Sequence, residues 1–381
     1  MQEETAFLTE RAKNGPALVT AVMGVHPSAA NHNMEVLNDT NKVMLAEMAN
    51  QIEQAGSKLC IQLFHVGRNA AAGALVDGSA IPCAPSAIPS PIYKAMPKEL
   101  CEVEIEDIYT YFSKAAKLCQ DAGVHVVEIS CSAGYLLSEF LSEKTNLRTD
   151  QYGGSRENRE RFPLRVIQAV REAVGNSYPV ILRISGADMM GGYTVADMQS
   201  FCQSAEPYID AVNVTGGWHE AHIPQITMQL PPGGFAFLAA AIKQAVNVPV
   251  IACNRINNHE IAEEILQEGF ADFIGGARAY LTDSRYAYKI ENNLPYKHCI
   301  GCNKGCIENV FKSQPITCIF NPMIGHEAAY HEAITKQASV KEKTLIIGGG
   351  PGGLCAAQNL ALIGHQVTLC TKESMGLTST H

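Results

Sequence analysis

The chain has 381 residues, of which 46% are hydrophobic and 18% are charged, a composition typical of a globular protein with one large domain or two ordinary ones. The net charge of −9 excludes a basic surface for nucleic acid or anionic lipid, and no apolar run reaches the length of a membrane span. The 13 cysteines, with no charged and apolar leader before them, predict a reducing cytoplasmic location where thiols stay available as ligands.

The first three quarters of the chain alternate short apolar strands with amphipathic helices. A helical pattern, ETAFLTERAKNG, opens the chain, and an apolar strand, ALVTAV, follows it with no strand before it. Further strands are predicted at residues 58–64, 125–130, 179–185, 210–215, 248–253 and 271–276, with helical periods such as VMLAEMANQIEQAG and NHEIAEEILQEG between them. Because this alternation contains no dinucleotide fingerprint, it favours an α/β fold, a closed (β/α)8 TIM barrel whose first strand is missing, over an open doubly wound sheet.

Polar side chains follow several of these strands, and the chemistry of a barrel gathers at the carboxyl ends of its strands. The candidates are Gln62, His65, Tyr135, Arg183, Trp218, His219, Arg255 and Arg278. Arg255 and Arg278 end the last two strands, where two guanidinium groups suit the phosphate of a cofactor or, equally, tie loops to helix ends. Tyr135 and His219 can converge as a proton-donating pair, although a Tyr in a GYLL run is more often a core residue. The Pro-rich segment 81–97 is expected to cover the barrel mouth as a loop.

Four cysteines follow the barrel in the spacing C-x2-C-x3-C-x11-C: Cys299, Cys302, Cys306 and Cys318. Three of these thiols come from one tight turn and the fourth from further along the chain. Four soft thiolates select zinc or an iron–sulfur cluster. Structural zinc sites usually pair two C-x2-C knuckles or include histidine, so the spacing favours one cuboidal cluster, with a zinc knuckle as the alternative.

After a polar run, the sequence TLIIGGGPGGLCAAQNLALIGHQVTLC predicts a strand, a helix and a second strand. Gly348, Gly350 and Gly353 form a GxGxxG fingerprint at the first turn, where glycines let the backbone approach a pyrophosphate at the helix amino terminus. The remaining residues provide only the start of a Rossmann-like nucleotide-binding domain. The predicted organisation is a barrel at 1–292, a cysteine segment at 293–329, a linker at 330–343 and a partial dinucleotide-binding unit at 344–381.

Several of these stretches resemble one family, the flavin reductases built like Old Yellow Enzyme, in the branch that contains bacterial 2,4-dienoyl-CoA reductase and trimethylamine dehydrogenase. The resemblance runs from about Ala6 to Thr371. It rests on IQLFHVGR, on GYLLSEFLSEKTNLRTDQYGGSRENRERF, on the cysteine spacing and on the GxGxxG. The run GGWHEAHIP followed by ACNRIN resembles the dienoyl-CoA reductases in particular.

The resemblance implies an FMN in the barrel, one 4Fe-4S cluster, an FAD in the following domain and NADPH as the electron donor. Gln62 resembles the residue that bonds the flavin pyrimidine edge, and Arg183 resembles the residue that steadies negative charge near flavin N1 and O2. The remaining matches are Arg255, Ala277 and Arg278 with the FMN phosphate site, Gly348, Gly350 and Gly353 with the FAD site, Tyr135 with the proton donor, His219 with its partner, and the four cysteines with the cluster ligands.

The implied reaction is NADPH-dependent reduction of the C4=C5 double bond of a 2,4-dienoyl-CoA thioester in unsaturated fatty acid β-oxidation, with electrons passing through FAD, the cluster and FMN. A related enone or steroid reductase or amine dehydrogenase is the alternative, and an inactive zinc-binding fragment is a second one. The oligomeric state and the acyl chain length are not predicted.

The sequence departs from the family pattern at three positions and at both ends. Ser130 and Ala133 stand where Old Yellow Enzyme relatives carry His with His or Asn, and Thr371 stands near the usual position of the acidic residue that binds the adenosine ribose. About forty residues of the family's amino end, judged from a typical βα unit, and most of its nucleotide domains have no counterpart here. We therefore expect a piece of a longer enzyme, with little activity alone.

Overall fold

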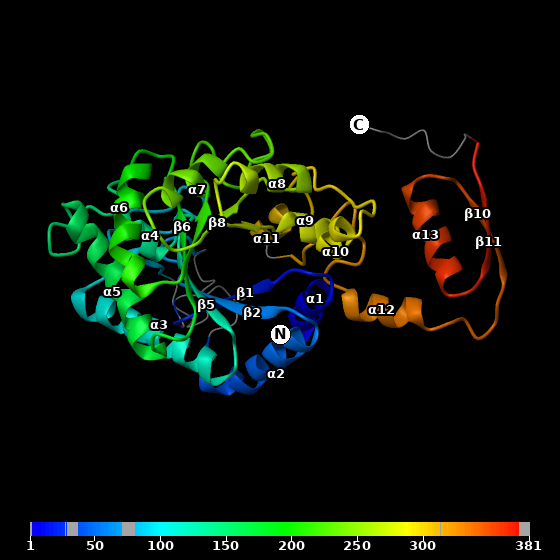
Figure 1. Ribbon diagram of the computed structural model, residues 1–381, viewed down its shortest axis with the longest axis horizontal. Coiled ribbons are helices and arrows are strands. Elements are labelled where there is room, and N and C mark those ends of the chain that lie inside the picture. Colours follow the sequence, from blue (N-terminus) through cyan, green and yellow to red (C-terminus); the bar gives the residue numbers. More distant parts are fainter. Residues whose placement is uncertain (1, 27, 29–36, 71–80, 313, 373–381) are drawn as a thin grey trace. The chain divides into compact units, whose positions relative to one another are not determined.

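The computed structural model describes residues 2–26, 28, 37–70, 81–312 and 314–372, and the chain divides into two compact units, residues 1–322 and 323–381 (Figure 1). The strands of the first unit are β1 (Leu18–Gly24), β2 (Lys58–Phe64), β3 (Cys83–Ala84), β4 (Lys98–Glu99), β5 (Val126–Cys131), β6 (Val180–Ser185), β7 (Ala211–Thr215), β8 (Val250–Cys253) and β9 (Phe273–Gly275). Its helices are α1 (Gln2–Ala12), η2 (Asp39–Asn41), α2 (Lys42–Gln54), α3 (Glu102–Asp121), α4 (Leu136–Leu141), α5 (Arg156–Val174), α6 (Val195–Ala205), η3 (Glu206–Tyr208), α7 (Ala236–Lys243), α8 (His259–Gln267), α9 (Arg278–Thr282), α10 (Tyr286–Glu291) and α11 (Ile307–Phe311).

Seven strands form one parallel sheet in the order β1-β2-β5-β6-β7-β8-β9, so neighbours in the sheet are neighbours in the predicted strand sequence. The sheet curls, and helices line its outer side (Figure 1). All seven predicted strands are present, because each is a short apolar run that both layers of a parallel α/β fold can bury. The prediction of an α/β fold of the TIM-barrel type is confirmed.

The prediction of a closed barrel is wrong for the described part of the chain. Within it, β1 pairs with β2 alone and β9 pairs with β8 alone, so the sheet is a curled, open half-barrel. At the spacing and tilt of this fold eight strands complete the circle, and seven leave a gap between the first and the last.

The two faces of the curled sheet differ in polarity, and this difference places the site. Side chains pointing toward the helices are apolar and fully buried, as Leu59, Ile61 and Leu63 of β2 show. Alternate residues of a strand point to the other face. On that inner face Gln62 is paired in register with Glu128, and Arg183 with Asn213. A barrel interior is usually filled by branched apolar side chains, so this polar band indicates a ligand site.

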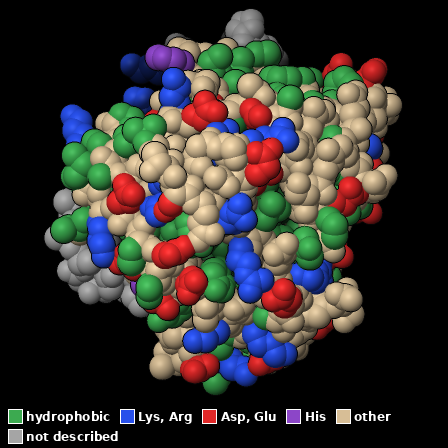
Figure 2. Space-filling view, turned by 90° about the vertical axis from the view of Figure 1, so that its left-hand side faces the viewer, with side chains coloured by type: hydrophobic (Ala, Val, Ile, Leu, Met, Phe, Trp, Pro, Cys, Tyr) green, Lys and Arg blue, Asp and Glu red, His purple; other side chains and the backbone are tan. Residues whose placement is uncertain are grey.

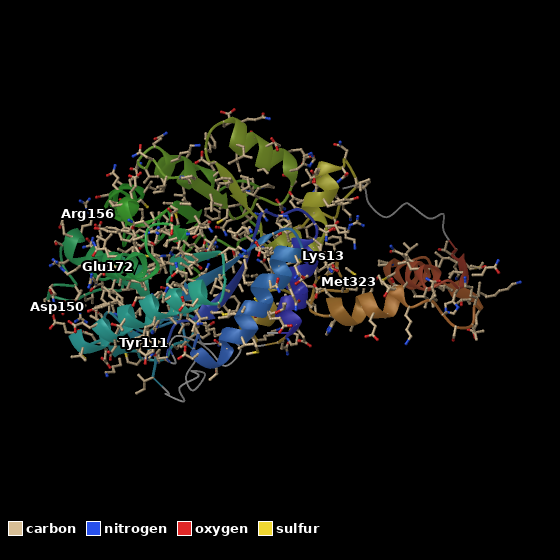
Figure 3. The ribbon with its side chains drawn as sticks, turned by 60° about the horizontal axis from the view of Figure 1, so that its bottom comes forward. Lys13, Tyr111, Asp150, Arg156, Glu172 and Met323 are labelled. Carbon is tan, nitrogen blue, oxygen red and sulfur yellow. The ribbon has the colours of Figure 1, made fainter. Side chains whose placement is uncertain are left out.

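Helix α5 shows how the local sequence sets the element boundaries. The Ser155 hydroxyl caps its amino terminus by accepting from the Asn158 amide at 3.3 Å, and Gly175 ends it with a φ of 76°. Its buried face includes Phe162 and Val166. Charged side chains of both signs are exposed on this helix, among them Arg156 and Glu172, which Figure 3 labels.

The second unit, which begins at Met323, contains α12 (Glu327–Thr335), β10 (Lys343–Ile347), α13 (Pro351–Leu362) and β11 (Gln366–Cys370). Strands β10 and β11 pair in parallel, as expected for a βαβ unit. The first part of the predicted linker 330–343 is helical, because α12 continues to Thr335. Its sequence EAAYHEAIT is rich in Glu and Ala, which favour helix despite the polarity that suggested a linker.

The charges on the surface and the apolar character of the helices are relevant to the expectation that neither nucleic acid nor membrane is a partner. On the face drawn in Figure 2, Lys and Arg side chains are interspersed with Asp and Glu, and neither sign dominates. Among the described residues, no helix combines the length and the apolar character needed to cross a membrane.

Candidate functional site

A network of polar side chains crosses the inner face of the half-barrel. The Gln62 amide donates to Glu128 Oε1 at 2.5 Å, and the Asn213 amide donates to Glu128 Oε2 at 2.7 Å. Arg183 Nη1 lies 3.9 Å from Glu128 Oε1, and the Cys253 thiol donates to Asn213 Oδ1 at 3.3 Å. Residues of five successive strands of the sheet, β2 and β5–β8, therefore meet around one buried carboxylate.

This network contains two of the predicted flavin-binding residues, Gln62 and Arg183, and both are partly accessible from the inner face. The sequence interpretation missed Glu128, which is 3% exposed, and Asn213. A signal for Glu128 was present, since it is the one carboxylate in the apolar run HVVEIS, and buried charges need partners.

Tyr135 and His219 converge as the sequence suggested. Tyr135 is the residue before α4, in the loop after β5, and His219 is in the loop after β7. The Tyr135 hydroxyl and His219 Nε2 lie 3.1 Å apart, at hydrogen-bonding distance. The Tyr135 ring packs edge-on against Phe64, the last residue of β2, with ring centroids 4.4 Å apart. The pair therefore lies at the carboxyl ends of the strands, beside the inner face.

The protonation states of this pair follow from its surroundings. Burial, reinforced by the positive charge of Arg183, lowers the pKa of His219 to about 4, so its imidazole is neutral at pH 7. Burial also raises the pKa of Tyr135 above its ordinary value, so the phenol stays protonated. Among the described residues, His219 Nδ1 has no hydrogen-bond partner although it is buried. The pair can hold a phenolic proton and stabilise the phenolate that remains after its transfer.

Buried polar contacts fix the loops that carry the pair. Arg68, after β2, forms an ion pair with Glu220, and both side chains are almost fully buried. The Asn69 amide donates to the Gly134 carbonyl at 2.6 Å and accepts from the Ser90 hydroxyl at 2.6 Å. Ser90 belongs to the Pro-rich segment 81–97, which therefore lies at the carboxyl ends of the strands. These contacts connect the loops next to Tyr135 and His219.

Arg255 and Arg278, which follow the last two strands of the sheet, contact the cysteine segment. Arg278 Nη1 donates to Asn303 Oδ1 at 2.6 Å, and Arg255 Nε donates to the Leu230 carbonyl at 3.0 Å. A Cβ atom on Gly301 would lie only 2.4 Å from Arg255 Nη1. Both arginines therefore tie loops together, which was one of the two readings of the sequence. The assignment of Arg255, Ala277 and Arg278 to an FMN phosphate stays a prediction.

The four predicted ligand cysteines line a single pocket. Cys299, Cys302, Cys306 and Cys318 share it with Arg278, Leu281, Thr282, Ile300, Asn303, Gly305, Thr317, Ile319 and Phe320. Its loop turns through Gly301, whose φ is 71°, and Asn303, whose φ is 59°. Among the described residues, no group of three or more His, Cys, Asp or Glu side chains is gathered closely enough for one metal ion. The thiols therefore surround a common space without meeting at a single point.

In the second unit, the three glycines of the fingerprint lie at the turn between β10 and α13. Gly348 has a φ of 111°, which a side chain would strain, and Gly350 is the residue before the helix. A Cβ atom on Gly353 would lie 1.9 Å from the Gly348 carbonyl oxygen, so only glycine fits there. The turn has the close backbone approach that a dinucleotide site requires.

A pH-dependent stability is expected from His65, which follows β2 and is 1% exposed. Burial, with the charge of His26 as a smaller cause, lowers the pKa of His65 from 6.5 to about 3. The unfolded chain therefore binds a proton below pH 6.5 that the folded chain takes up only near pH 3. Above pH 6.5 the histidine is neutral in both states, so it causes no loss of stability. Between pH 6.5 and pH 3, His65 lowers the free energy of unfolding by up to about 1.4 kcal/mol for each pH unit of acidification.

Urea unfolding at pH 7 and pH 5 measures this dependence. The variant His65→Gln is expected to lose less stability between these pH values than the wild-type chain. His222→Gln, at an exposed histidine, serves as the matched control and is expected to keep the wild-type dependence. An unchanged dependence in His65→Gln would show that other groups cause the acid sensitivity.

Comparison with known proteins connects this architecture to one family. The sequence pattern of the NADH:flavin oxidoreductase / NADH oxidase family matches residues 1–297. A metal reductase from Desulforamulus reducens is 46% identical over 369 residues, which are 95% of this chain and 54% of that protein. The chain spans about half the length of the curated relatives it matches.

Two solved structures are similar over nearly the whole chain. A 2-naphthoyl-CoA reductase in complex with 2-naphthoyl-CoA is 31% identical with a TM-score of 0.89, covering 97% of this chain and 59% of that one. A histamine dehydrogenase from Rhizobium sp. 4-9 is 26% identical with a TM-score of 0.83, covering 96% and 55%. With its parallel half-barrel and the family match over residues 1–297, this chain belongs to the NADH:flavin oxidoreductase / NADH oxidase family, the family of Old Yellow Enzyme.

Proposed function

We propose that this protein is a flavin-dependent reductase of conjugated CoA thioesters, with 2,4-dienoyl-CoA as the substrate class and NADPH as the donor. The observation that carries the proposal is the partly buried Tyr135–His219 pair, with 3.1 Å between its polar atoms, beside the polar inner face. The similarity to a 2-naphthoyl-CoA reductase supports a CoA thioester, because that substrate also conjugates a thioester with carbon–carbon double bonds.

The residues of the inner face fit an FMN. Gln62 supplies an amide and Arg183 a guanidinium on a partly accessible surface, which suits the polar edge of a flavin and the negative charge of its reduced form. Arg255, Ala277 and Arg278 are the proposed phosphate-binding residues. When bound, FMN supplies a hydride to the substrate.

The cysteine pocket fits a 4Fe-4S cluster better than zinc. Structural zinc sites usually pair two C-x2-C knuckles or include histidine, so the spacing C-x2-C-x3-C-x11-C favours a cluster. Cys299, Cys302, Cys306 and Cys318 line one pocket, where a single inorganic group can contact all four thiols. The cluster supplies one-electron transfer between two flavins.

The fingerprint of Gly348, Gly350 and Gly353 fits the pyrophosphate of an FAD. When bound, FAD would connect the two-electron chemistry of NADPH with the one-electron chemistry of the cluster. Thr371 is the exception. It stands where an acidic side chain usually binds the ribose, so this contact has to come from another group.

The proposed role of the pair follows from charge balance. Addition of a hydride to carbon 5 of a 2,4-dienoyl thioester leaves a negative charge spread over the conjugated system and the carbonyl oxygen. A proton from Tyr135 at carbon 4 neutralises it and breaks the phenolic O–H bond. The tautomer of His219 that carries its proton on Nε2 donates to the phenolate, and solvent then returns the proton.

A second candidate function, oxidation of a small amine, is supported by the similarity to a histamine dehydrogenase. Recognition of a quaternary amine would use an aromatic cage. Trp218, the single tryptophan, is fully buried and donates to the Tyr193 hydroxyl at 2.8 Å, so it is not open to a ligand. This contact disfavours quaternary amines among the possible substrates.

Flavin reoxidation tests the proposal. The FMN-loaded protein is photoreduced without oxygen and mixed in turn with 2,4-hexadienoyl-CoA, 2-naphthoyl-CoA and cyclohexenone, and the oxidised protein is mixed with histamine. We expect 2,4-hexadienoyl-CoA to reoxidise the flavin fastest. Reaction with cyclohexenone alone, or flavin reduction by histamine, would contradict the assignment.

A further inference from the structure

The carboxylate of Glu128 is the centre of the inner-face network, although the proposed reaction does not use it. It is 3% exposed and accepts hydrogen bonds from Gln62 and Asn213, with Arg183 Nη1 3.9 Å away. We propose that Glu128 is a positioning residue that orients Gln62 and sets the effective charge of Arg183 toward the flavin. This inference rests on the proposed binding of FMN to the inner face.

The orientation of Gln62 follows from the chemistry of its partner. A buried carboxylate only accepts hydrogen bonds, so the Gln62 amide must turn its NH2 group toward Glu128. Its carbonyl oxygen is then left for the ligand, and it can bind only a donor. In a flavin the pyrimidine edge offers one such donor, the N3–H group, between two carbonyl oxygens. Glu128 therefore selects which atom of Gln62 meets the ring.

Asn213 is oriented in the same way. Its NH2 group donates to Glu128 Oε2 at 2.7 Å, and its Oδ1 accepts from the Cys253 thiol at 3.3 Å. The two carboxylate oxygens therefore have different donors. Gln62 comes from β2 and Asn213 from β7, the strands that flank β5 and β6 in the sheet. A neutral amide in place of Glu128 has an NH2 group where one of these two oxygens stands, and that group cannot accept a hydrogen bond from the neighbour on its side.

The charge of Glu128 acts on Arg183. At 3.9 Å in a poorly solvated site, the carboxylate offsets part of the guanidinium charge. Without this offset, Arg183 would stabilise the negative charge of a reduced flavin more strongly. Loss of the Glu128 charge should therefore move the FMN midpoint potential to a more positive value. A carboxylate with only a structural role would not change the potential.

The test compares Glu128→Gln with the wild-type chain by FMN titration and by anaerobic measurement of the FMN midpoint potential. We expect the Kd for FMN to rise about tenfold, as for one lost buried hydrogen bond, and the potential to become more positive. The matched control is Glu160→Gln, at a buried carboxylate on α5 whose partner Arg156 lies on the outer surface (Figure 3). It is expected to change neither quantity.

The outcomes separate this inference from the proposed function. A wild-type Kd and a wild-type potential in folded Glu128→Gln overturn the role of Glu128 and leave the flavin assignment in place. Failure of the wild-type chain to bind FMN overturns both. If Glu128→Gln does not fold, Asn213→Ala removes one donor from the same carboxylate. An FMN affinity weaker by about threefold then supports the inference, and an unchanged affinity contradicts it.

Discussion

Replacement of Cys306 by serine is expected to remove the proposed iron–sulfur cluster, lowering the iron content from about four atoms per chain to less than one. Cys306 is one of four thiols around a single pocket. With three thiolates left, one iron atom of the cluster would have no protein ligand, which destabilises the cluster. Iron and sulfide analysis of anaerobically reconstituted protein, together with the visible absorption of the cluster, measures the change. The same loss is expected for Cys299, Cys302 and Cys318.

The matched control is Cys370→Ser. This thiol is exposed on β11, in the second unit, and is outside the four-cysteine pocket. Its replacement should leave iron and sulfide unchanged. One zinc atom per wild-type chain, with no sulfide, would contradict the cluster and favour the zinc-binding alternative. The result is informative even if reconstitution of the flavins is incomplete, because it does not depend on activity.

The second large effect is expected from Tyr135→Phe, which should slow reduction of 2,4-hexadienoyl-CoA by about 10²- to 10⁴-fold, the usual contribution of a general acid. The variant keeps the ring that packs against Phe64 and removes only the hydroxyl 3.1 Å from His219. Stopped-flow reoxidation of photoreduced FMN isolates this step. The FMN affinity should stay unchanged, because the phenol is not among the proposed flavin contacts.

Tyr178→Phe is the control for loss of a buried phenol. Its hydroxyl donates to the Val124 carbonyl at 2.8 Å and takes no part in the proposed site. It should lower stability without slowing reoxidation. A Tyr135→Phe rate within threefold of the wild-type rate would exclude the phenol as the proton donor. The double variant Tyr135→Phe/His219→Gln is compared with Tyr135→Phe alone. A slower rate in the double variant would show that the imidazole has a role independent of the Tyr135 hydroxyl.

The local sequence was sufficient for the seven strands of the main sheet. Each strand of the sheet is a short apolar run between amphipathic helices, and burial of such runs depends on nearby residues. The fingerprint glycines were also predictable, since a φ of 111° at Gly348 and a carbonyl oxygen 1.9 Å from a Cβ on Gly353 exclude other side chains. The start of the polar run at 330–343 is helical, because helix propensity in α12 outweighs the polarity of these residues.

Other features depend on contacts between residues far apart in the chain. The gap between β1 and β9 results from the number and tilt of all seven strands, which no single strand encodes. The partners of Glu128 come from β2 and β7, so only the register of the whole sheet brings them together.

The sequence by itself determined the parallel α/β architecture, the Tyr135 and His219 candidates and the spacing of the four cysteines. The tertiary structure decided that the sheet is open, that Glu128 is surrounded by donors, and that Arg278 lines the cysteine pocket. The physical reason is the separation along the sequence over which each effect acts. Strand and turn preferences depend on neighbouring residues, whereas a buried charge takes its partners from whichever strands the sheet places beside it.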